Sequence, residues 1–201
     1  MPFIHPLSVY TPSTTFILLK GVTQHLGVSS IARHLAETYT QQNHKVLIFD
    51  ALLGLKNYPI KNSNTSKITA VLNGLAPLSD LIVHDKGIDV IAGSSQQNLN
   101  AIDPTGQQKI KSDLMKLALN YQVVIIDHPA SIIHSLFEEF DNVIYVSTPD
   151  PKTLLKTLQM AAKEKAPKLI LNNIENDEDR NQAHLFVKNV LPKCQIVNFF
   201  K

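Results

Sequence analysis

The chain has 201 residues, of which 44% are hydrophobic and 18% charged, and its formal net charge is +2. These values are typical of a globular domain with a full core, exclude an intrinsically disordered chain and give no reason by themselves to expect nucleic-acid binding. The single cysteine, Cys194, excludes an internal disulfide and a cysteine-based metal site, and no stretch reaches the roughly 18 consecutive apolar residues of a membrane span.

Residues 1–13 hold three prolines and are predicted to be an irregular lead-in without a secretory leader, so that one cytoplasmic domain fills residues 14–201. The stretch TFILLKG (15–21) is predicted as a buried strand, followed by a loop and by a helix over 28–43 with Ser29 or Ser30 as its cap. The remaining predicted elements are strand 44–51, polar loop 57–66, two short helices within 67–85, strand 88–94, helix 104–120, strand 121–129, short helix 132–140, strand 142–149, helix 150–165, strand 167–174, helix 177–190 and strand 194–200.

The predicted strands are continuous apolar runs, which indicates that both of their faces are buried. Because they alternate with helices of about 10–15 residues, the pattern predicts βαβ units. We therefore expect a doubly wound α/β domain with a mostly parallel sheet, helices on both faces and three layers. Ligands of such sheets bind beyond the carboxyl ends of the strands.

Polar residues follow several of these strands. Asp50 ends the second strand, Asp127 ends the strand VVIID, and Asn172 ends LIL. An acidic residue directly after an apolar strand, facing a loop that ends in serine, is the arrangement that holds Mg²⁺ beside a nucleoside triphosphate. Two such residues at strand ends are stronger evidence than one, because a single aspartate often only caps a helix.

Five segments in the same order resemble the MinD/ParA family of P-loop ATPases, and most of all its flagellar branch (FlhG, FleN or YlxH). They are HKVLIFDALLGLKN, DLIVHDKGIDVIAGSS, YQVVIIDHPAS, VIYVSTPDPKTLLKTLQMAAK and LILNNI. The resemblance implies a P-loop NTPase fold. It further implies a nucleotide site at Gly21, Gly27, Ser29, Ser30 and Asn172, and a Mg²⁺ site at Ser29, Asp50 and Asp127.

The sequence departs from the family pattern in the loop, which in the family reads K-G-G-V-G-K-[ST]. Aligned on Gly27, the signature lysine falls on Thr23, two glycines fall on Gln24 and His25, and the phosphate-binding lysine falls on Val28. In the switch segment, the second aspartate of the family falls on Leu52. Phosphoryl transfer depends on positioned positive charge, so we expect no catalytic residues and a degenerate site without ATP or Mg²⁺.

The interpretation we favour is a non-catalytic regulatory or scaffold protein in flagellar or other spatial organisation, including cell division and polar placement. We expect a protein partner on the switch region, at Gly54, Asn57, His128 and Pro129. Because Thr23 replaces the lysine that in the family reaches across a nucleotide-bound dimer, we expect a monomer or a dimer that does not depend on ATP. The chain ends at IVNFFK without the amphipathic helix of membrane-cycling relatives, so no membrane anchor is expected.

Two alternatives stay open. The chain could be an active ATPase with an atypical loop, using Ser29, Asp50 and Asp127 to hold Mg²⁺ with ATP. It could also be a DNA-segregation helper, although the low net charge argues against specific nucleic-acid binding.

In the loop, His25 could replace a cation, and His128 could fill the Mg²⁺ space. Cellulose-secretion relatives cannot be separated from flagellar ones by sequence.

Overall fold

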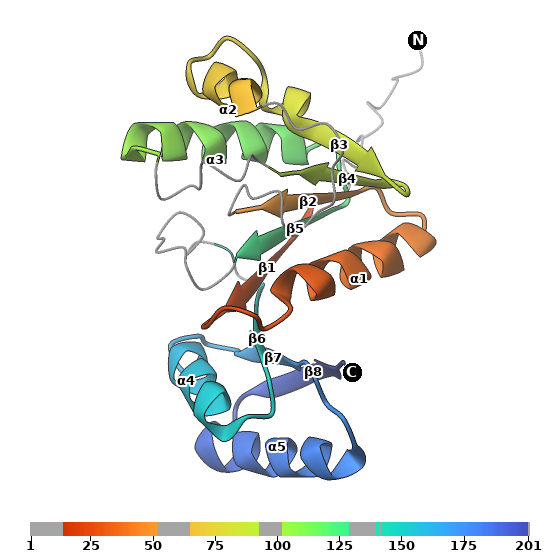
Figure 1. Cartoon of the computed structure of the whole chain (residues 1–201), viewed down its shortest axis with the longest axis vertical. Helices are drawn as coiled ribbons and strands as arrows, with labels where there is room; N and C mark the ends of the chain where they lie inside the picture. Colours follow the sequence, from red (N-terminus) through yellow and green to blue (C-terminus); the bar gives the residue numbers. More distant parts are fainter. Residues whose placement is uncertain (1–13, 52–64, 93–101, 129–139, 141, 201) are drawn as a thin grey trace, which may run out of the picture.

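The computed structural model describes residues 14–51, 65–92, 102–128, 140 and 142–200, and an eight-stranded sheet runs through them (Figure 1). The strands are β1 Thr15–Gly21, β2 Val46–Asp50, β3 Ile82–Asp85, β4 Ile88–Ile91, β5 Val123–His128, β6 Val143–Ser147, β7 Lys168–Leu171 and β8 Gln195–Phe199. The helices are α1 Val28–Gln41, α2 Thr65–Leu72, α3 Pro104–Ala118, α4 Pro151–Ala161 and α5 Asp177–Val190, with a 3-10 turn, η1, at Leu78–Leu81.

The strand order is β3-β4-β2-β5-β1-β6-β7-β8, and every pair is parallel except β3 with β4. β1 therefore lies inside the sheet, between β5 and β6. The chain leaves β1 toward β2 on one side and later returns to β6 on the other, so the direction of winding reverses at β1. This confirms the predicted doubly wound, mostly parallel fold, and it puts the expected ligand edge at the carboxyl end of β1.

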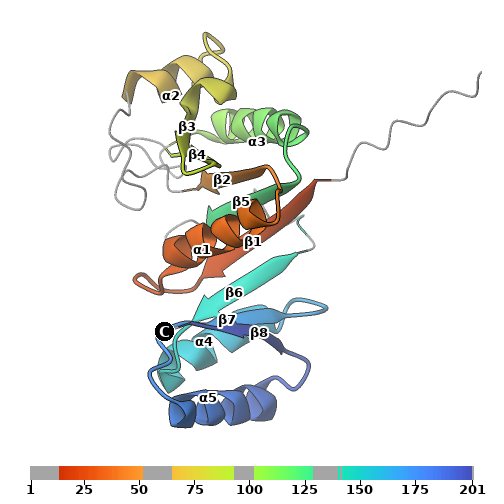
Figure 2. The same cartoon turned by 90° about the vertical axis from the view of Figure 1, so that its right-hand side faces the viewer.

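Continuous apolar runs form the inner strands, as expected for strands covered on both faces. All of β2 is buried, and Phe49 and Ile48 are 0% and 1% exposed. Figure 1 shows α1 on one face of the sheet and α3 and α4 on the other, and Figure 2 shows α1 in front of β1 and β5. α1 buries Ile31, Ala32 and Ala36 against the sheet. This packing fixes the position of the helix, which begins directly after the loop 22–27.

The structure corrects two local predictions. Residues 82–85, expected to be helical, form β3, which pairs antiparallel with β4 at one edge of the sheet. The predicted cap of α1 is also wrong, because the N-cap residue is Gly27 and no side chain caps the helix. Two further predictions lie mostly outside the described residues. They are the short helix at 132–140, of which residues 132–139 are not described, and the polar loop at 57–66, of which residues 57–64 are not described.

Candidate functional site

The carboxyl ends of β2, β5 and β1 meet at one edge of the sheet. Asp50 is in register with Asp127, and Asp127 is in register with Leu19 of β1, two residues before the strand ends at Gly21. Residues in register on neighbouring parallel strands lie on the same face of the sheet, about 5 Å apart along the backbone. The topology therefore brings together the two aspartates that the sequence singled out, beside the start of the loop 22–27.

Both aspartates are completely buried, with 0% of each residue exposed. Two carboxylates this close repel each other when both are ionised, and a divalent cation or a shared proton relieves the repulsion. In the described part of the chain, no group of three or more His, Cys, Asp or Glu side chains is clustered for a metal. The protein oxygens fit Mg²⁺ in kind, since Mg²⁺ sites commonly use one or two carboxylates and complete their shell with water and substrate phosphates.

The loop between β1 and α1 turns apolar side chains inward. Val22, Leu26 and Val28 are 6%, 4% and 5% exposed, whereas Gln24 and His25 are exposed to solvent. A methyl group of Val28 lies so close to Gly21 that a Cβ added there would be 2.9 Å from it. Val28 therefore packs under the loop, at the position that the resemblance assigns to a phosphate-binding lysine.

Asn172 ties the loop to the end of β7. Its side-chain Nδ2 donates to the carbonyl oxygen of Leu26 at 2.9 Å, and its backbone N–H donates to the Ser147 carbonyl at 2.8 Å. Gly27 adopts a positive φ of 75°, and a Cβ there would lie 2.3 Å from Asn172 Nδ2. The residue that the resemblance assigns to the base thus holds the loop in place, and only glycine fits opposite it.

The first turn of α1 points backbone N–H groups toward this edge. Ser29 and Ser30 occupy the second and third helical positions, inside the helix rather than capping it, and Ser30 is exposed. Ile31 donates its N–H to the Gly27 carbonyl at 3.0 Å and so closes the first turn. Backbone donors together with the helix dipole favour an anion at such an end. The loop itself, residues 22–27, contains no lysine or arginine, and its one histidine, His25, is exposed to solvent.

The other predicted site residues divide into two groups. His128 ends β5 and is only 2% exposed, so its side chain is buried rather than available to a partner. Leu52, Gly54, Asn57 and Pro129 lie outside the described residues.

Sequence reasoning missed a buried polar pair beside the site. Ser147 and Thr157 are both 0% exposed, and their hydroxyl oxygens lie 3.1 Å apart. They join the end of β6 to the middle of α4, next to the carbonyl that holds Asn172. Thr157 also donates to the Thr153 carbonyl at 2.9 Å, four residues earlier in the helix. A threonine on the apolar stripe of a predicted helix was the available signal.

Comparison with known proteins gives a consistent result. The family model described as cellulose biosynthesis protein BcsQ matches residues 14–188. The flagellum site-determining protein YlxH of Helicobacter pylori is 28% identical over 155 residues, which are 71% of this chain and 51% of YlxH. The chain therefore spans about half the length of this relative.

Solved structures share the fold. The MinC:MinD cell division protein complex of Aquifex aeolicus is matched with a TM-score of 0.69 at 19% identity, over 92% of this chain and 80% of that one. A plasmid partition protein of Borrelia burgdorferi bound to AMPPNP is matched with a TM-score of 0.68 at 16% identity, over 93% and 86% of the two chains. Among the described residues, no helix is both long and apolar enough to cross a membrane.

Proposed function

The chain belongs to the family of the cellulose biosynthesis protein BcsQ, within the MinD/ParA class of P-loop ATPases, and we propose that it is a non-catalytic member that regulates or organises its machinery by binding proteins. The observation that carries this proposal is Val28. Where the family pattern has a lysine that binds phosphate, this chain has a side chain that is 5% exposed and packs against Gly21.

The physical cost of this replacement is large. Each positioned donor to a developing oxyanion contributes about 3–4 kcal/mol to transition-state stabilisation. The family pattern has two lysines in the loop, and this chain has Thr23 and Val28 at those positions. Their loss reduces the rate of phosphoryl transfer by more than about a hundredfold, before any loss of binding is counted. The amide of Asn172 is also engaged by Leu26, which supports a loop that is closed on itself.

A second candidate, an active ATPase with an atypical loop, is favoured by one observation. Asp50 and Asp127 are buried in register at the edge where Mg²⁺ would be held, with Ser29 on the adjoining helix. If ATP binds, these oxygens and the phosphates would share the cation, and Mg²⁺ would lower the barrier by neutralising charge on the transferred phosphoryl group. Without a firmly held triphosphate, the cation lacks most of its ligands.

The pathway follows from the relatives by analogy. The family description names cellulose biosynthesis, and the similar YlxH protein is a flagellum site-determining protein. We propose cellulose biosynthesis as the setting, with flagellar placement as the rival, and a cytoplasmic location in either case. Deleting the gene and measuring cellulose yield and flagellar number separates the two settings.

Calorimetry with ATP tests the proposal directly. The wild-type chain is titrated with ATP, with and without Mg²⁺, beside a variant that carries Thr23→Lys, Gln24→Gly, His25→Gly and Val28→Lys and so restores the lysines and glycines of the family pattern. We expect no measurable heat from the wild type up to about 1 mM ATP, and a Mg²⁺-dependent gain in the restored variant. Tight Mg²⁺-dependent binding by the wild type, followed by release of phosphate, would make the ATPase the correct function.

A further inference from the structure

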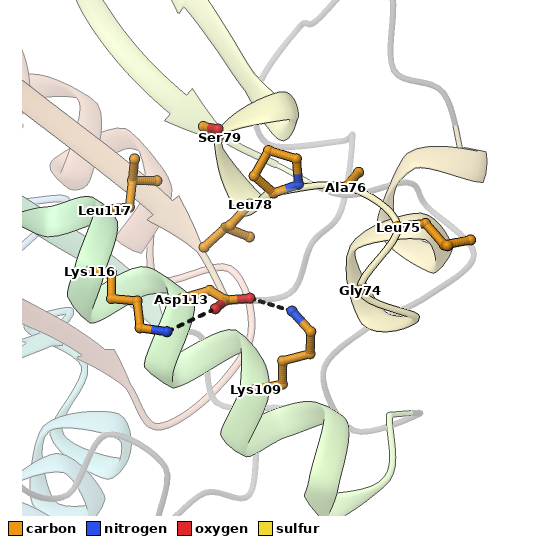
Figure 3. A pocket seen from close by; sticks show the side chains of 10 residues that line it. Gly74, Leu75, Ala76, Leu78, Ser79, Lys109, Asp113, Lys116 and Leu117 are labelled. Atoms are coloured by element: carbon orange, nitrogen blue, oxygen red, sulfur yellow. Dashed lines mark hydrogen bonds and ion pairs between the residues drawn. The ribbon is translucent and has the colours of Figure 1, made fainter.

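Two hollows adjoin each other along α3, away from the strand-end site. One, of about 540 Å³, lies between residues 74–79 and the side of α3 that carries Lys109, Asp113 and Lys116 (Figure 3). The other, of about 460 Å³, lies on the outer side of the helix around Ser112 and Met115. Lys116 lines both, so they form one surface on the layer of the molecule that contains α2 and α3.

Exposed apolar side chains gather on this surface. Leu75 and Leu119 are each 81% exposed and Met115 is 41% exposed. Single exposed leucines are ordinary on protein surfaces, but several around adjoining hollows mark an interaction site. The inner face of α3 already buries Ile110 and Leu114 in the core. Met115 and Leu119, four residues apart, therefore belong to a second apolar stripe that the core does not use.

Lysines surround these apolar residues. Among the described residues that line the two hollows, Lys109, Lys111 and Lys116 carry three positive charges and Asp113 one negative charge, a net +2. Asp113 pairs with Lys109 and lies 4.0 Å from the ammonium of Lys116, whose side chain is 77% exposed. The contact of the exposed Lys116 with Asp113 contributes little to stability, so a carboxylate of a partner can engage Lys116 at little cost.

We propose that this α3 surface, defined by Leu75, Met115, Leu119 and the three lysines, binds an amphipathic acidic helix of a protein partner. Apolar anchors spaced three or four residues apart would enter the hollows, and glutamate or aspartate side chains beside them would meet the lysines. Charge complementarity favours this occupant over a polyanion. A net charge of +2 is small for binding a phosphate backbone, and a phosphate backbone would leave the exposed side chains of Leu75, Met115 and Leu119 uncovered, whereas the apolar face of a helix would bury them.

A panel of synthetic peptides tests the proposal on the full chain. The first peptide is an amphipathic helix of about 15 residues, the length of α3, with leucines on one face and glutamates flanking them. A second peptide has lysines in place of the glutamates, and a third has the composition of the first in scrambled order. Binding is measured by calorimetry, and its location by changes in the amide NMR signals of the isotope-labelled chain.

We expect the acidic peptide to bind at least about tenfold more tightly than the basic and scrambled ones, with signal changes around Leu75, Met115 and Leu119. Met115→Glu and Leu119→Ser should each weaken binding about tenfold, and Lys116→Glu should reduce the preference for the acidic peptide. Leu185→Ser is the matched control, because Leu185 is 67% exposed on α5, outside both hollows, and this variant should bind as the wild type does.

Five outcomes would overturn the proposal. Equal affinity for acidic and basic peptides would contradict the charge argument. A failure to bind any peptide would rule out the α3 surface as a binding site, and so would signal changes that fall elsewhere on the chain. Co-sedimentation with phosphatidylglycerol vesicles that is lost in Leu119→Ser would identify a membrane as the occupant. Concentration-dependent changes of the same signals without peptide would identify a second copy of the chain.

Discussion

At the scale of single residues, the strand-end site depends on close contacts that leave no room for change. Gly27, the N-cap of α1, has a φ of 75°, and Asn172 Nδ2 occupies the space that a side chain at this position would need. Gly74 has almost the same φ, 72°, but nothing lies within 4 Å of the position of its Cβ. The two glycines separate the cost of a left-handed backbone from the cost of a steric clash.

Replacing these glycines by alanine should therefore give unequal losses of stability. Gly74→Ala should lower the free energy of unfolding by about 1–2 kcal/mol, the cost of a left-handed conformation for an L-residue. Gly27→Ala should cost that amount plus about 1–3 kcal/mol for overpacking against Asn172. Urea unfolding of both variants measures the difference. Equal losses would mean that Asn172 moves aside freely and does not hold the loop.

Cys194 provides a second test at this scale. Burial raises the pKa of its thiol to about 11, two units above the ordinary value of 9.0, because the charged thiolate is desolvated. Only the thiolate reacts with alkylating agents, so at pH 8 the folded chain should react with iodoacetamide about a hundredfold more slowly than the chain unfolded in urea. The rate of alkylation, followed by mass spectrometry, checks this. Similar rates in the two states would show that Cys194 is accessible in the folded protein.

At the scale of elements, the sequence predicted what depends on apolar patterning and missed what depends on turns. The inner strands and α3, α4 and α5 were found because their apolar runs or stripes are long. β3 was missed because IVHD is short and lies at a sheet edge. Its hairpin turn uses Lys86 and Gly87, both with positive φ, and Lys-Gly is a weaker turn signal than Asn-Gly.

The candidate site, like the secondary structure, could be predicted from the sequence only in part. Asp50, Asp127 and Asn172 could be named because strand ends meet at one edge in any parallel sheet. The cap of α1 could not be predicted, because two serines beside a glycine offer several possible helix starts. Gly27 takes the cap position at a place where Asn172 leaves no room for a side chain. The inward packing of Val22 and Leu26 was also missed, although apolar residues in a loop are a visible signal.

The start of α4 gives a prediction for pH. Asp150 caps this helix by accepting from the Thr153 backbone N–H at 2.9 Å, and this hydrogen bond lowers the pKa of its carboxyl below 3.8. A carboxyl whose pKa is lower in the folded state stabilises it above the unfolded pKa and loses this contribution as the pH falls through the folded pKa. Asp150→Ala should therefore lower the urea midpoint at pH 6, and by less near pH 3.

Asp150→Asn is the control for this effect. Asparagine caps helices about as well as aspartate but does not titrate. The midpoint of this variant should stay close to that of the wild type at pH 6. A difference between wild type and Asp150→Ala that stays constant from pH 6 to pH 3 would contradict a capping role for the ionised carboxylate.

At the scale of the whole molecule, an eight-stranded sheet surrounds the loop 22–27, which contains no lysine or arginine. The chain matches a chain of the MinC:MinD cell division protein complex with a TM-score of 0.69 at 19% identity, so the two share their fold. The departure from the lysines of the family's loop pattern is local, at Thr23 and Val28. The core includes Leu19 and Phe49 and also Val28, which stands at the position of the family's phosphate-binding lysine, so the packing of this fold does not require a lysine there.

The assembly state is where this difference should be visible. In the family that the chain resembles, two copies enclose the nucleotide and the signature lysine of each reaches into the other, and Thr23 stands at that position here. We expect the mass measured by light scattering during gel filtration to be the same with and without ATP and Mg²⁺, whether the chain is a monomer or a dimer. A variant with Thr23→Lys and Val28→Lys restores both positive charges and should gain a response to ATP if the cations are what is missing. A wild-type mass that doubles when ATP and Mg²⁺ are added would mean that the chain holds nucleotide between two copies without either lysine.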